Sequence, residues 1–326
     1  MIDTTTQKEA ASVSATFYRD VLKGLSSSPK TLDSKYFYDA VGDGLFQEIM
    51  ACPEYYPTRC ETEILSGQAG QICEAFRRDG SDFDIIELGA GDASKTKYLL
   101  EHLSSKGVHF LYQPVDISTS TINYLNHVFP KNIPGLNVKG YQGDYFEKLR
   151  EAMDTSPERR KIILFLGGNI GNMPATQISE FCGKLRSNIR PGDMVLMGMD
   201  LKKDPETILA AYNDGAGITR RFNLNLLERI NRELDGNFDL NNFSHFPTYN
   251  PITYTCKSYL VSRKNQSVII GESVIRFEQD EAILMEISQK FAPSDISDLA
   301  TRHGFQVLKQ FTDSKQWFAD SLWLAN

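Results

Sequence analysis

The 326-residue sequence lacks an apolar run near the about 20 residues that a bilayer-spanning helix needs, and its first ten residues have neither an apolar core nor an arginine-rich face. It also lacks a basic surplus. The formal net charge is −7, whereas proteins that bind duplexes or membrane surfaces usually carry excess positive charge. We therefore expect a cytoplasmic protein without a targeting segment, with neither a membrane nor nucleic acid as partner.

Metal-binding and disulfide patterns are missing as well. None of the five cysteines forms a C-x-x-C pair, and their number is odd. No two of the five histidines stand at i, i+3 or i, i+4 spacing. These absences favour free thiols in a reducing compartment and predict no metal site.

What is present is an alternation of strands and helices. Short apolar runs alternate with helical periodicity, which predicts parallel strands joined by crossover helices. Strands are expected at 84–88, 109–115, 136–141, 161–166 and 193–199, and helices at 61–77, 94–103, 118–128 and 176–189. A helix at 295–303 and strands at 305–311 and 317–324 follow. By fold-level analogy, such a terminal helix and hairpin would complete a seven-stranded sheet with one antiparallel strand.

Residues 202–288 interrupt this plan. They contain helical patterns at 204–212 and 222–234, and strand-like alternation at 253–261, 267–270 and 273–276. Residues 1–60 add a helix at 14–25 and an aromatic-rich stretch. We therefore predict two domains. A Rossmann-like domain comprises 61–201 plus 289–326, and a second α+β domain comprises 1–60 plus 202–288 and is built against the ligand edge of the sheet.

A glycine motif follows the first predicted strand. Gly89 and Gly91 let the backbone approach a ligand closely, but Ser94 stands where a dinucleotide fingerprint has its third glycine. Asp92 would also repel a pyrophosphate. The acidic residues Glu87 and Asp92 instead suit a cationic ligand without phosphate, such as S-adenosylmethionine.

Acidic residues also end the next two strands. Asp116 is placed to accept hydrogen bonds from ribose hydroxyls, and Asp144 from an adenine amine, with Tyr145 or Phe146 packing on the ring. In parallel sheets these strand ends meet at the ligand-binding edge. Each aspartate taken singly is better explained as a helix N-cap or a turn residue, and it is the occurrence of acidic residues at three successive strand ends that favours a cofactor site.

Seven strings make the chain resemble the histidine-specific S-adenosylmethionine-dependent methyltransferases of ergothioneine biosynthesis. They lie in order along almost the whole chain and include the interruption. They are KYFYD (35–39), PEYYPTR (53–59), ELGAG (87–91), GGNIGN (167–172), AYND (211–214), FNLNLLERINREL (222–234) and EIS (286–288). Asn169 departs from the threonine expected in the family's glycine string. The strand around 256–260, expected to wall the substrate pocket, carries no string that we align.

The resemblance implies a class I methyltransferase fold, S-adenosylmethionine as cofactor, and transfer of methyl groups to the α-amino group of free L-histidine, giving the trimethylated betaine hercynine. It also implies the site. The cofactor would be lined by Glu87, Gly89, Gly91, Lys95, Asp116, Asp144, Tyr145 and Gly167. The amino acid's α-amino and carboxylate groups would contact Tyr38, Tyr55, Asn172 and Tyr212, and its imidazole would face Glu286 and Ser288.

The residue chemistry agrees with these roles and leaves alternatives open. Tyrosine hydroxyls and an asparagine amide suit a zwitterion, and Glu286 and Ser288, two apart on a strand, would point the same way. Tyr38 and Asn172 are the catalytic candidates, with Tyr38 orienting the amine. Read individually, Tyr38 and Tyr55 also fit core aromatics, Asn172 a helix cap, and Lys95 and Glu286 exposed positions.

Three other functions remain to be separated by experiment. The same fold would serve another amino acid or a small primary amine as acceptor. A nicotinamide-dependent oxidoreductase is disfavoured by the missing third glycine. A non-catalytic binding protein would keep the pocket without turnover. We expect a monomer whose partner is a small-molecule amino acid.

Overall fold

The computed structural model describes residues 4–78 and 80–326. The chain divides into two compact units. The larger unit comprises 57–202 and 289–326, and the smaller unit comprises the chain up to residue 56 together with 203–288. The sequence-based boundaries follow residues 60, 201 and 288. The first differs most, because helix α3 (Tyr56–Gly67) carries the chain into the larger unit without a break.

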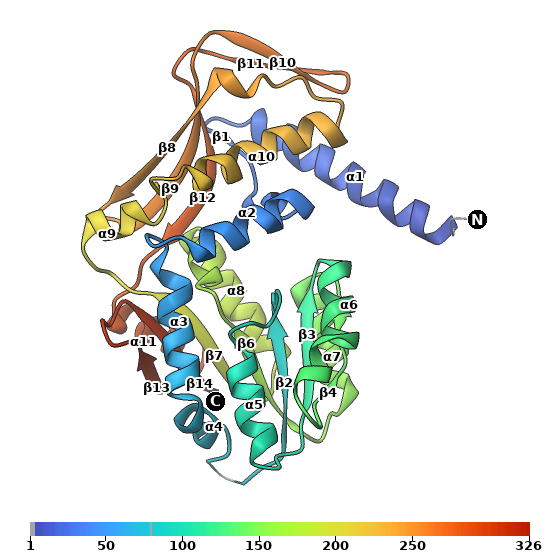
Figure 1. The fold of residues 1–326 in the computed structure, drawn as a ribbon, viewed down its shortest axis with the longest axis vertical. Coiled ribbons are helices and arrows are strands. Elements are labelled where there is room, and N and C mark those ends of the chain that lie inside the picture. The colour runs from blue at the N-terminus through green and yellow to red at the C-terminus, as the bar shows by residue number, and fades with distance from the viewer. Residues whose placement is uncertain (1–3, 79) are drawn as a thin grey trace. The chain divides into compact units, whose positions relative to one another are not determined.

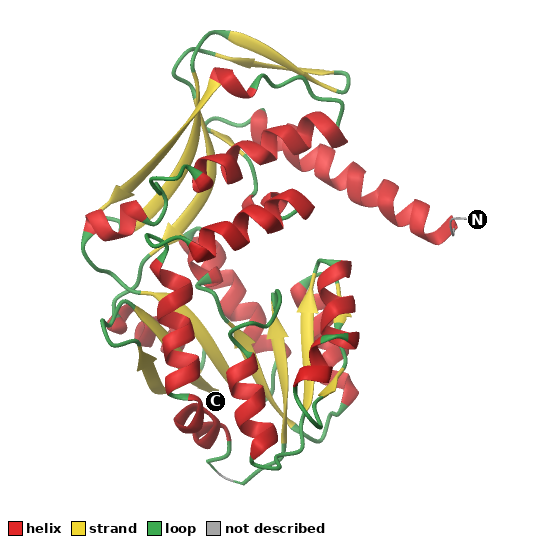
Figure 2. Ribbon diagram, in the orientation of Figure 1, coloured by secondary structure: helices red, strands yellow, loops and turns green. Residues whose placement is uncertain are grey.

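One sheet forms the centre of the larger unit (Figures 1 and 2). Its strands run in the order β13-β14-β7-β6-β2-β3-β4, and β5 also pairs with β3. The bounds are β2 Phe83–Leu88, β3 Leu111–Asp116, β4 Asn137–Val138, β5 Tyr141–Gln142, β6 Arg160–Phe165, β7 Met194–Asp200, β13 Phe305–Thr312 and β14 Phe318–Ala325. Strand β14 is antiparallel to both of its neighbours, while the pairs among β2 to β7 are parallel. The predicted α/β architecture with one antiparallel strand is therefore confirmed.

The edge of this sheet differs from the prediction. Within the described residues the sheet has eight strands, not seven, because the strand expected at 136–141 is split into β4 and β5. The backbone N–H of Gly140 donates to the side chain of Asn126 at 2.7 Å instead of continuing the ladder. A Cβ at position 140 would lie 3.1 Å from Ile122 and Asn126, so helix α6 fixes the break.

Helices cover both faces of the sheet. Helices α7 (Tyr145–Thr155), α8 (Ala175–Asn188) and α11 (Pro293–Arg302) share one apolar cluster with the strands. Helices α3, α4 (Ala69–Phe76) and α5 (Lys97–Ser105) cross the other face, and α6 (Thr119–His127) lies beside β3 (Figure 1). The single helix expected at 61–77 is two helices, because Gln68 leaves helical geometry and its side chain donates to the Thr312 carbonyl at 2.8 Å.

The smaller unit is built on a four-stranded sheet in the order β1-β12-β9-β8. Its strands are β1 Lys30–Thr31, β8 Phe243–Asn250, β9 Thr255–Ser262 and β12 Ala282–Gln289, and its helices are α1 Thr4–Leu25, α2 Ala40–Ala51, α9 Pro205–Ala210 and α10 Ile218–Glu233. Short 3₁₀ helices in the chain are η1 Ser34–Phe37, η2 Phe129–Asn132, η3 Asn169–Asn172 and η4 Leu240–Asn242. Helix α10 packs its apolar face against α2 and the sheet through Phe222, Leu226 and Ile230.

The strands expected at 253–261, 267–270 and 273–276 do not form one sheet. Strands β10 (Gln266–Ile270) and β11 (Ser273–Phe277) pair with each other as a separate two-stranded ribbon, which Ile270 also links to Gly236 by one isolated bridge, whereas β9 joins the four-stranded sheet. The tight turn between Ile270 and Ser273 needs the positive φ of +56° at Gly271, which folds the two strands back on themselves.

The places where the chain leaves and re-enters the larger unit are joined. The N–H of Lys202 donates to the Phe291 carbonyl, and the N–H of Phe291 donates to the Asp200 carbonyl, each over 2.9 Å. Beside them the Lys290 ammonium donates to the Asp200 carboxylate at 2.7 Å, and both side chains are buried. A buried, hydrogen-bonded ion pair therefore closes the gap in the larger unit from which the insertion departs.

Candidate active site

The carboxyl end of β2 opens into the glycine loop. Gly89 and Gly91 have φ of +74° and +53°, values that favour glycine. A Cβ at Gly89 would lie 2.7 Å from the Tyr145 hydroxyl. The loop therefore excludes side chains where its backbone faces the strand ends, as close approach to a ligand requires.

Asp116 joins this loop to the end of β3. One carboxylate oxygen accepts from the Gly91 N–H at 3.1 Å, and the other accepts from the Ser118 N–H at 2.9 Å. The predicted glycine and aspartate positions thus come together at one edge of the sheet. The carboxylate is partly exposed, which leaves it accessible to a ligand.

Asp144 and Tyr145 follow β5. Asp144 caps helix α7, because its Oδ1 accepts from the N–H groups of Phe146 at 3.0 Å and Glu147 at 3.3 Å. Tyr145 packs its ring 5.9 Å from that of Phe165, and burial raises the pKa of its phenol to about 12. Asp144 therefore performs the capping role that was the simpler alternative. Both capping bonds use one oxygen, so capping does not exclude the role predicted from the resemblance.

Glu87 lies inside the fold beneath the loop. Its carboxylate accepts from the hydroxyls of Thr96, at 2.6 Å, and Tyr112, and only 3% of the residue is exposed. Burial raises its pKa to about 7, although both hydrogen bonds act to lower it. The geometry makes Glu87 a support of the loop and of the turn into α5.

Near the loop after β6 lie two residues that the sequence analysis did not select, Glu61 and Asp320. Lys95 is ion-paired with Glu61 of helix α3, and the second oxygen of Glu61 accepts from the Gly167 N–H at 2.7 Å. Gly167 itself has φ of +80°. Glu61 meets this loop only in the folded chain, where buried Asp320 of β14 interacts with Glu61 and Lys95. No local pattern in the sequence marks Glu61 or Asp320.

The acceptor residues fall into separate groups. Asn172 ends η3 in the larger unit, next to Gly171, whose missing side chain permits close approach to the Gln289 carbonyl. The remaining five belong to the smaller unit. There the Tyr212 hydroxyl donates to Ser288 Oγ at 2.7 Å, and both residues are buried.

Tyr38 and Tyr55 are brought together through Phe46. The ring of Tyr38 lies edge-on to Phe46 and Phe222 at 5.5 and 5.8 Å, and that of Tyr55 lies 6.3 Å from Phe46. Tyr38 is 38% exposed, although its ring contacts both phenylalanines. Both the core-aromatic alternative and a binding role are compatible with this arrangement.

Strand β12 carries Glu286 and Ser288, two residues apart. Its neighbour β9 carries Ser258, whose buried Oγ has no hydrogen-bond partner among the residues that the structure describes. His245 of β8 has a similarly orphaned Nε2, and burial lowers the pKa of this histidine to about 4. Buried polar atoms without partners are uncommon in proteins, and they are expected where a ligand completes the bonding.

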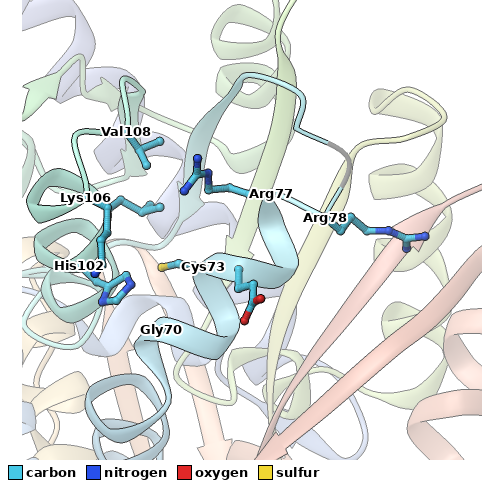
Figure 3. Close-up of a pocket in the computed structure, with 9 residues that line it drawn as sticks. Gly70, Cys73, Arg77, Arg78, His102, Lys106 and Val108 are labelled. Atoms are coloured by element: carbon cyan, nitrogen blue, oxygen red, sulfur yellow. The ribbon is translucent and has the colours of Figure 1, made fainter.

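A separate hollow of about 380 Å³ lies between α4 and α5 (Figure 3). Arg77, His102 and Lys106 are among its lining residues, and none of the predicted site residues is. Lys106 follows the C-terminus of α5, the crossover helix from β2 to β3, so the hollow is at the amino ends of the strands. We place the active site at the opposite, carboxyl edge, where ligands bind in such sheets.

Comparison with known proteins decides the family. The sequence profile described as "Histidine-specific methyltransferase, SAM-dependent" matches residues 17–325. The chain belongs to this family. The predicted enzyme class and cofactor are thereby confirmed: the protein is an S-adenosylmethionine-dependent methyltransferase, related to enzymes of ergothioneine biosynthesis.

Relatives within the family include two bacterial enzymes and one fungal enzyme. The histidine N-alpha-methyltransferase of Mycobacterium tuberculosis is 35% identical over 93% of both chains. That of Mycolicibacterium smegmatis is 34% identical over 96% of both chains. The 4-dimethylallyltryptophan N-methyltransferase of Claviceps fusiformis is 29% identical over 59% of this chain and 56% of its own. Relatives of this chain are thus named for different amino acid acceptors.

The side chains at the carboxyl edge fit the cofactor of this family. The glycine loop provides a cradle that a Cβ at position 89 would fill, Asp116 offers a partly exposed carboxylate at the end of β3, and Tyr145 supplies an aromatic surface. Among residues 4–78 and 80–326, no helix is both long and apolar enough to cross a membrane.

Proposed function

We propose that this methyltransferase transfers methyl groups to the α-amino group of free L-histidine and forms the trimethylated betaine hercynine. The observation that carries the proposal is the buried hydrogen bond between Tyr212 and Ser288. It joins a residue assigned to the amino acid's zwitterionic end to one assigned to its imidazole. The two histidine N-alpha-methyltransferases that the chain resembles over nearly its full length support the same acceptor.

In this proposal one set of residues holds the cofactor and another set holds the acceptor. Glu87, Gly89, Gly91, Lys95, Asp116, Asp144, Tyr145 and Gly167 would form the cofactor site, with Glu87 acting through the loop that it supports. When bound, S-adenosylmethionine supplies the electrophilic methyl group. Tyr38, Tyr55, Asn172 and Tyr212 would hold the α-amino and carboxylate groups, since their hydroxyl and amide groups both donate and accept.

The chain's contribution to the chemistry would be positioning. The amine must be neutral and its lone pair aligned, and fixing that alignment is a major source of rate enhancement. Tyr38 would orient the nitrogen and pass its proton towards water, which its 38% exposure permits. As methyls accumulate the amine loses N–H donors, so contacts to Asn172 would weaken and the carboxylate anchors would keep the acceptor bound.

A second acceptor class is favoured by one relative, the 4-dimethylallyltryptophan N-methyltransferase. Two buried polar atoms on neighbouring strands of the four-stranded sheet favour histidine as the acceptor instead. Ser258 Oγ and His245 Nε2 are buried and lack partners within the described part of the chain. A bulky apolar side chain beside them would leave both groups unsatisfied, which costs about 1–3 kcal/mol for each. An imidazole offers a donor and an acceptor.

The test is mass spectrometry of the purified protein incubated with S-adenosylmethionine and an equimolar mixture of the standard amino acids. We expect histidine alone to gain up to three methyl groups. Methylation of a different amino acid would leave the enzyme class standing and overturn the acceptor, and residues around Ser258 would then be examined. Cofactor binding without any methylated amino acid would overturn the proposal that the substrate is a free amino acid.

A further inference from the structure

One buried carboxylate connects three segments at the carboxyl edge of the larger unit. Glu61, on helix α3, is 0% exposed. One of its oxygens accepts from the Lys95 ammonium, and the other accepts from the Gly167 N–H at 2.7 Å. Lys95 follows the glycine loop after β2, and Gly167 follows β6. A side chain from a helix outside the glycine loops therefore fixes a group in each of the two loops.

The fold makes space for this carboxylate at one position. Gly198 lies in the middle of β7, and a Cβ there would collide first with Glu61 and would lie 3.2 Å from the Gly167 nitrogen. Any larger residue at position 198 would displace the carboxylate from Gly167. The glycine is needed for its missing side chain, not for its backbone conformation, because the strand is regular at this point.

Three ionisable side chains lie close together here: Glu61, Lys95 and Asp320. Asp320 stands opposite Gly198 in the register of β14 and β7, and it is wholly buried. Burial raises the pKa of Asp320 well above its usual range, and the negative charge of Glu61 adds to this effect while Lys95 opposes it. Burial alone would lower the pKa of Lys95, but Glu61 raises it. Asp320 is therefore the neutral member beside the ion pair of Lys95 and Glu61.

We propose that Glu61 is a positioning residue that holds the Lys95 ammonium and the Gly167 N–H in the arrangement that receives the cofactor. The proposal rests on the cofactor roles proposed above for Lys95 and Gly167, and it is independent of the identity of the acceptor. An ammonium has three donors, and Glu61 directs one of them. Its rotation is thereby restricted, and the remaining donors are presented in a fixed direction.

The test measures cofactor affinity separately from methyl transfer, by calorimetric titration with S-adenosylhomocysteine. Glu61→Gln keeps the size of the side chain but turns an amide donor towards Lys95. We expect 10- to 100-fold weaker binding, about the worth of a hydrogen bond to a charged group, with little change in the acceptor's KM. Glu63→Gln is the matched control, because exposed Glu63 lies on the same helix and accepts from the Ser314 N–H at 2.8 Å. Its affinity should match that of the native chain.

A double-mutant cycle separates positioning from a structural role. If Glu61 acts through Lys95, Glu61→Gln should weaken binding far less in a Lys95→Met background than alone. Equal losses in both backgrounds, or native affinity in Glu61→Gln, would overturn the proposal. If Glu61→Gln does not fold, the affinity of Glu61→Asp is measured in the same assay. This variant keeps the charge, but its side chain is too short to reach both Lys95 and the Gly167 N–H. Native affinity in that variant would likewise overturn it. Neither result depends on whether histidine is methylated.

Discussion

The hydroxyl of Tyr212 donates to Ser288 Oγ at 2.7 Å, although the two residues are 76 positions apart in the sequence. The bond ties the segment after α9 to the end of β12. Both residues are buried, so the pair fixes the direction of the serine's own hydroxyl hydrogen. If the serine faces the acceptor's imidazole, Tyr212 sets which way it donates.

Tyr212→Phe should therefore raise the KM for the acceptor more than it lowers kcat, and leave S-adenosylhomocysteine affinity unchanged. The loss of one buried hydrogen bond should also reduce the free energy of unfolding by about 0.5–1.5 kcal/mol. Steady-state kinetics and urea unfolding measure the two effects. Ser288→Ala should raise KM similarly, and the double variant should be no worse than the more affected single variant. Additive losses in KM would contradict a shared role.

Tyr38→Phe should lower turnover while leaving stability close to native. The substituted ring keeps its edge-on contacts with Phe46 and Phe222, and only the hydroxyl of a partly exposed residue is removed. Losing an orienting contact should reduce kcat about 10-fold or more, because general acid–base and positioning contributions are of this size or larger. Single-turnover kinetics with saturating cofactor and acceptor measure the effect.

Tyr36→Phe is the matched control for this prediction. The Tyr36 hydroxyl donates to Asp20 at 2.7 Å, so its removal should destabilise the fold by about 1 kcal/mol without changing kcat. A native kcat in Tyr38→Phe, or equal losses in both variants, would contradict the assignment of Tyr38 to the reaction.

Gly89→Ala should weaken cofactor binding. The new Cβ would lie 2.7 Å from the Tyr145 hydroxyl at a φ of +74°, so the loop must shift. Gly107→Ala is the control, because Gly107 has φ of +66° with nothing within 4 Å of the added Cβ. Both variants should lose about 1–2 kcal/mol of stability from the backbone conformation, but only Gly89→Ala should lose S-adenosylhomocysteine affinity. Adding Tyr145→Phe to Gly89→Ala relieves the collision and should restore part of that affinity unless Tyr145 itself contributes more.

His245 should contribute a loss of stability at mildly acidic pH. Burial lowers its pKa from 6.5 to about 4, so between these values the unfolded chain binds a proton that the folded chain does not. The contribution of His245 to the free energy of unfolding therefore decreases as pH falls through this window, by at most about 3 kcal/mol. His245→Gln should remove most of this slope, as measured by urea unfolding at several pH values.

Glu87 should change the free energy of unfolding with pH in the opposite direction. Its pKa is raised from 4.5 to about 7, so the folded chain binds the extra proton and stability falls as pH rises through that range. Glu87→Gln should abolish this decline without affecting the loss assigned to His245. If His245→Gln leaves the acidic slope unchanged, the histidine is not the group responsible.

Local patterns were sufficient to predict most of the larger unit. Parallel strands buried on both faces are nearly continuous apolar runs, and their glycine and aspartate ends follow from topology. Strand β6 contains an exception, a buried lysine within the apolar run. Lys161 is 1% exposed in β6, where its ammonium donates to Asp84 at 3.0 Å and to the Ser156 carbonyl at 2.7 Å. The run predicts the strand correctly because the charge is neutralised by a residue 77 positions earlier.

The smaller unit was harder to predict. Strand β8 has no regular alternation of buried and exposed residues and contains Pro247, so it does not resemble a strand locally. Helix α2 contains Gly42 and Gly44, which disfavour helices, yet Gly42 packs closely on the Phe37 carbonyl. Glu61 and Asp320 could not have been predicted as site residues from the sequence, because their roles depend on contacts made only in the tertiary structure.

The ion pair of Asp200 and Lys290, where the chain leaves and re-enters the larger unit, also bears on how such enzymes diversify. Because the ends of the insertion are joined by backbone hydrogen bonds and a buried ion pair, the cofactor-binding scaffold is closed without help from the inserted residues. Residues 203–288 can then change in length and sequence during evolution while the methyl-donor half is preserved. Residues 203–288 share their core with the chain up to residue 56, so a lineage that acquires a new acceptor must change both segments together, and a protein engineer would have to exchange both.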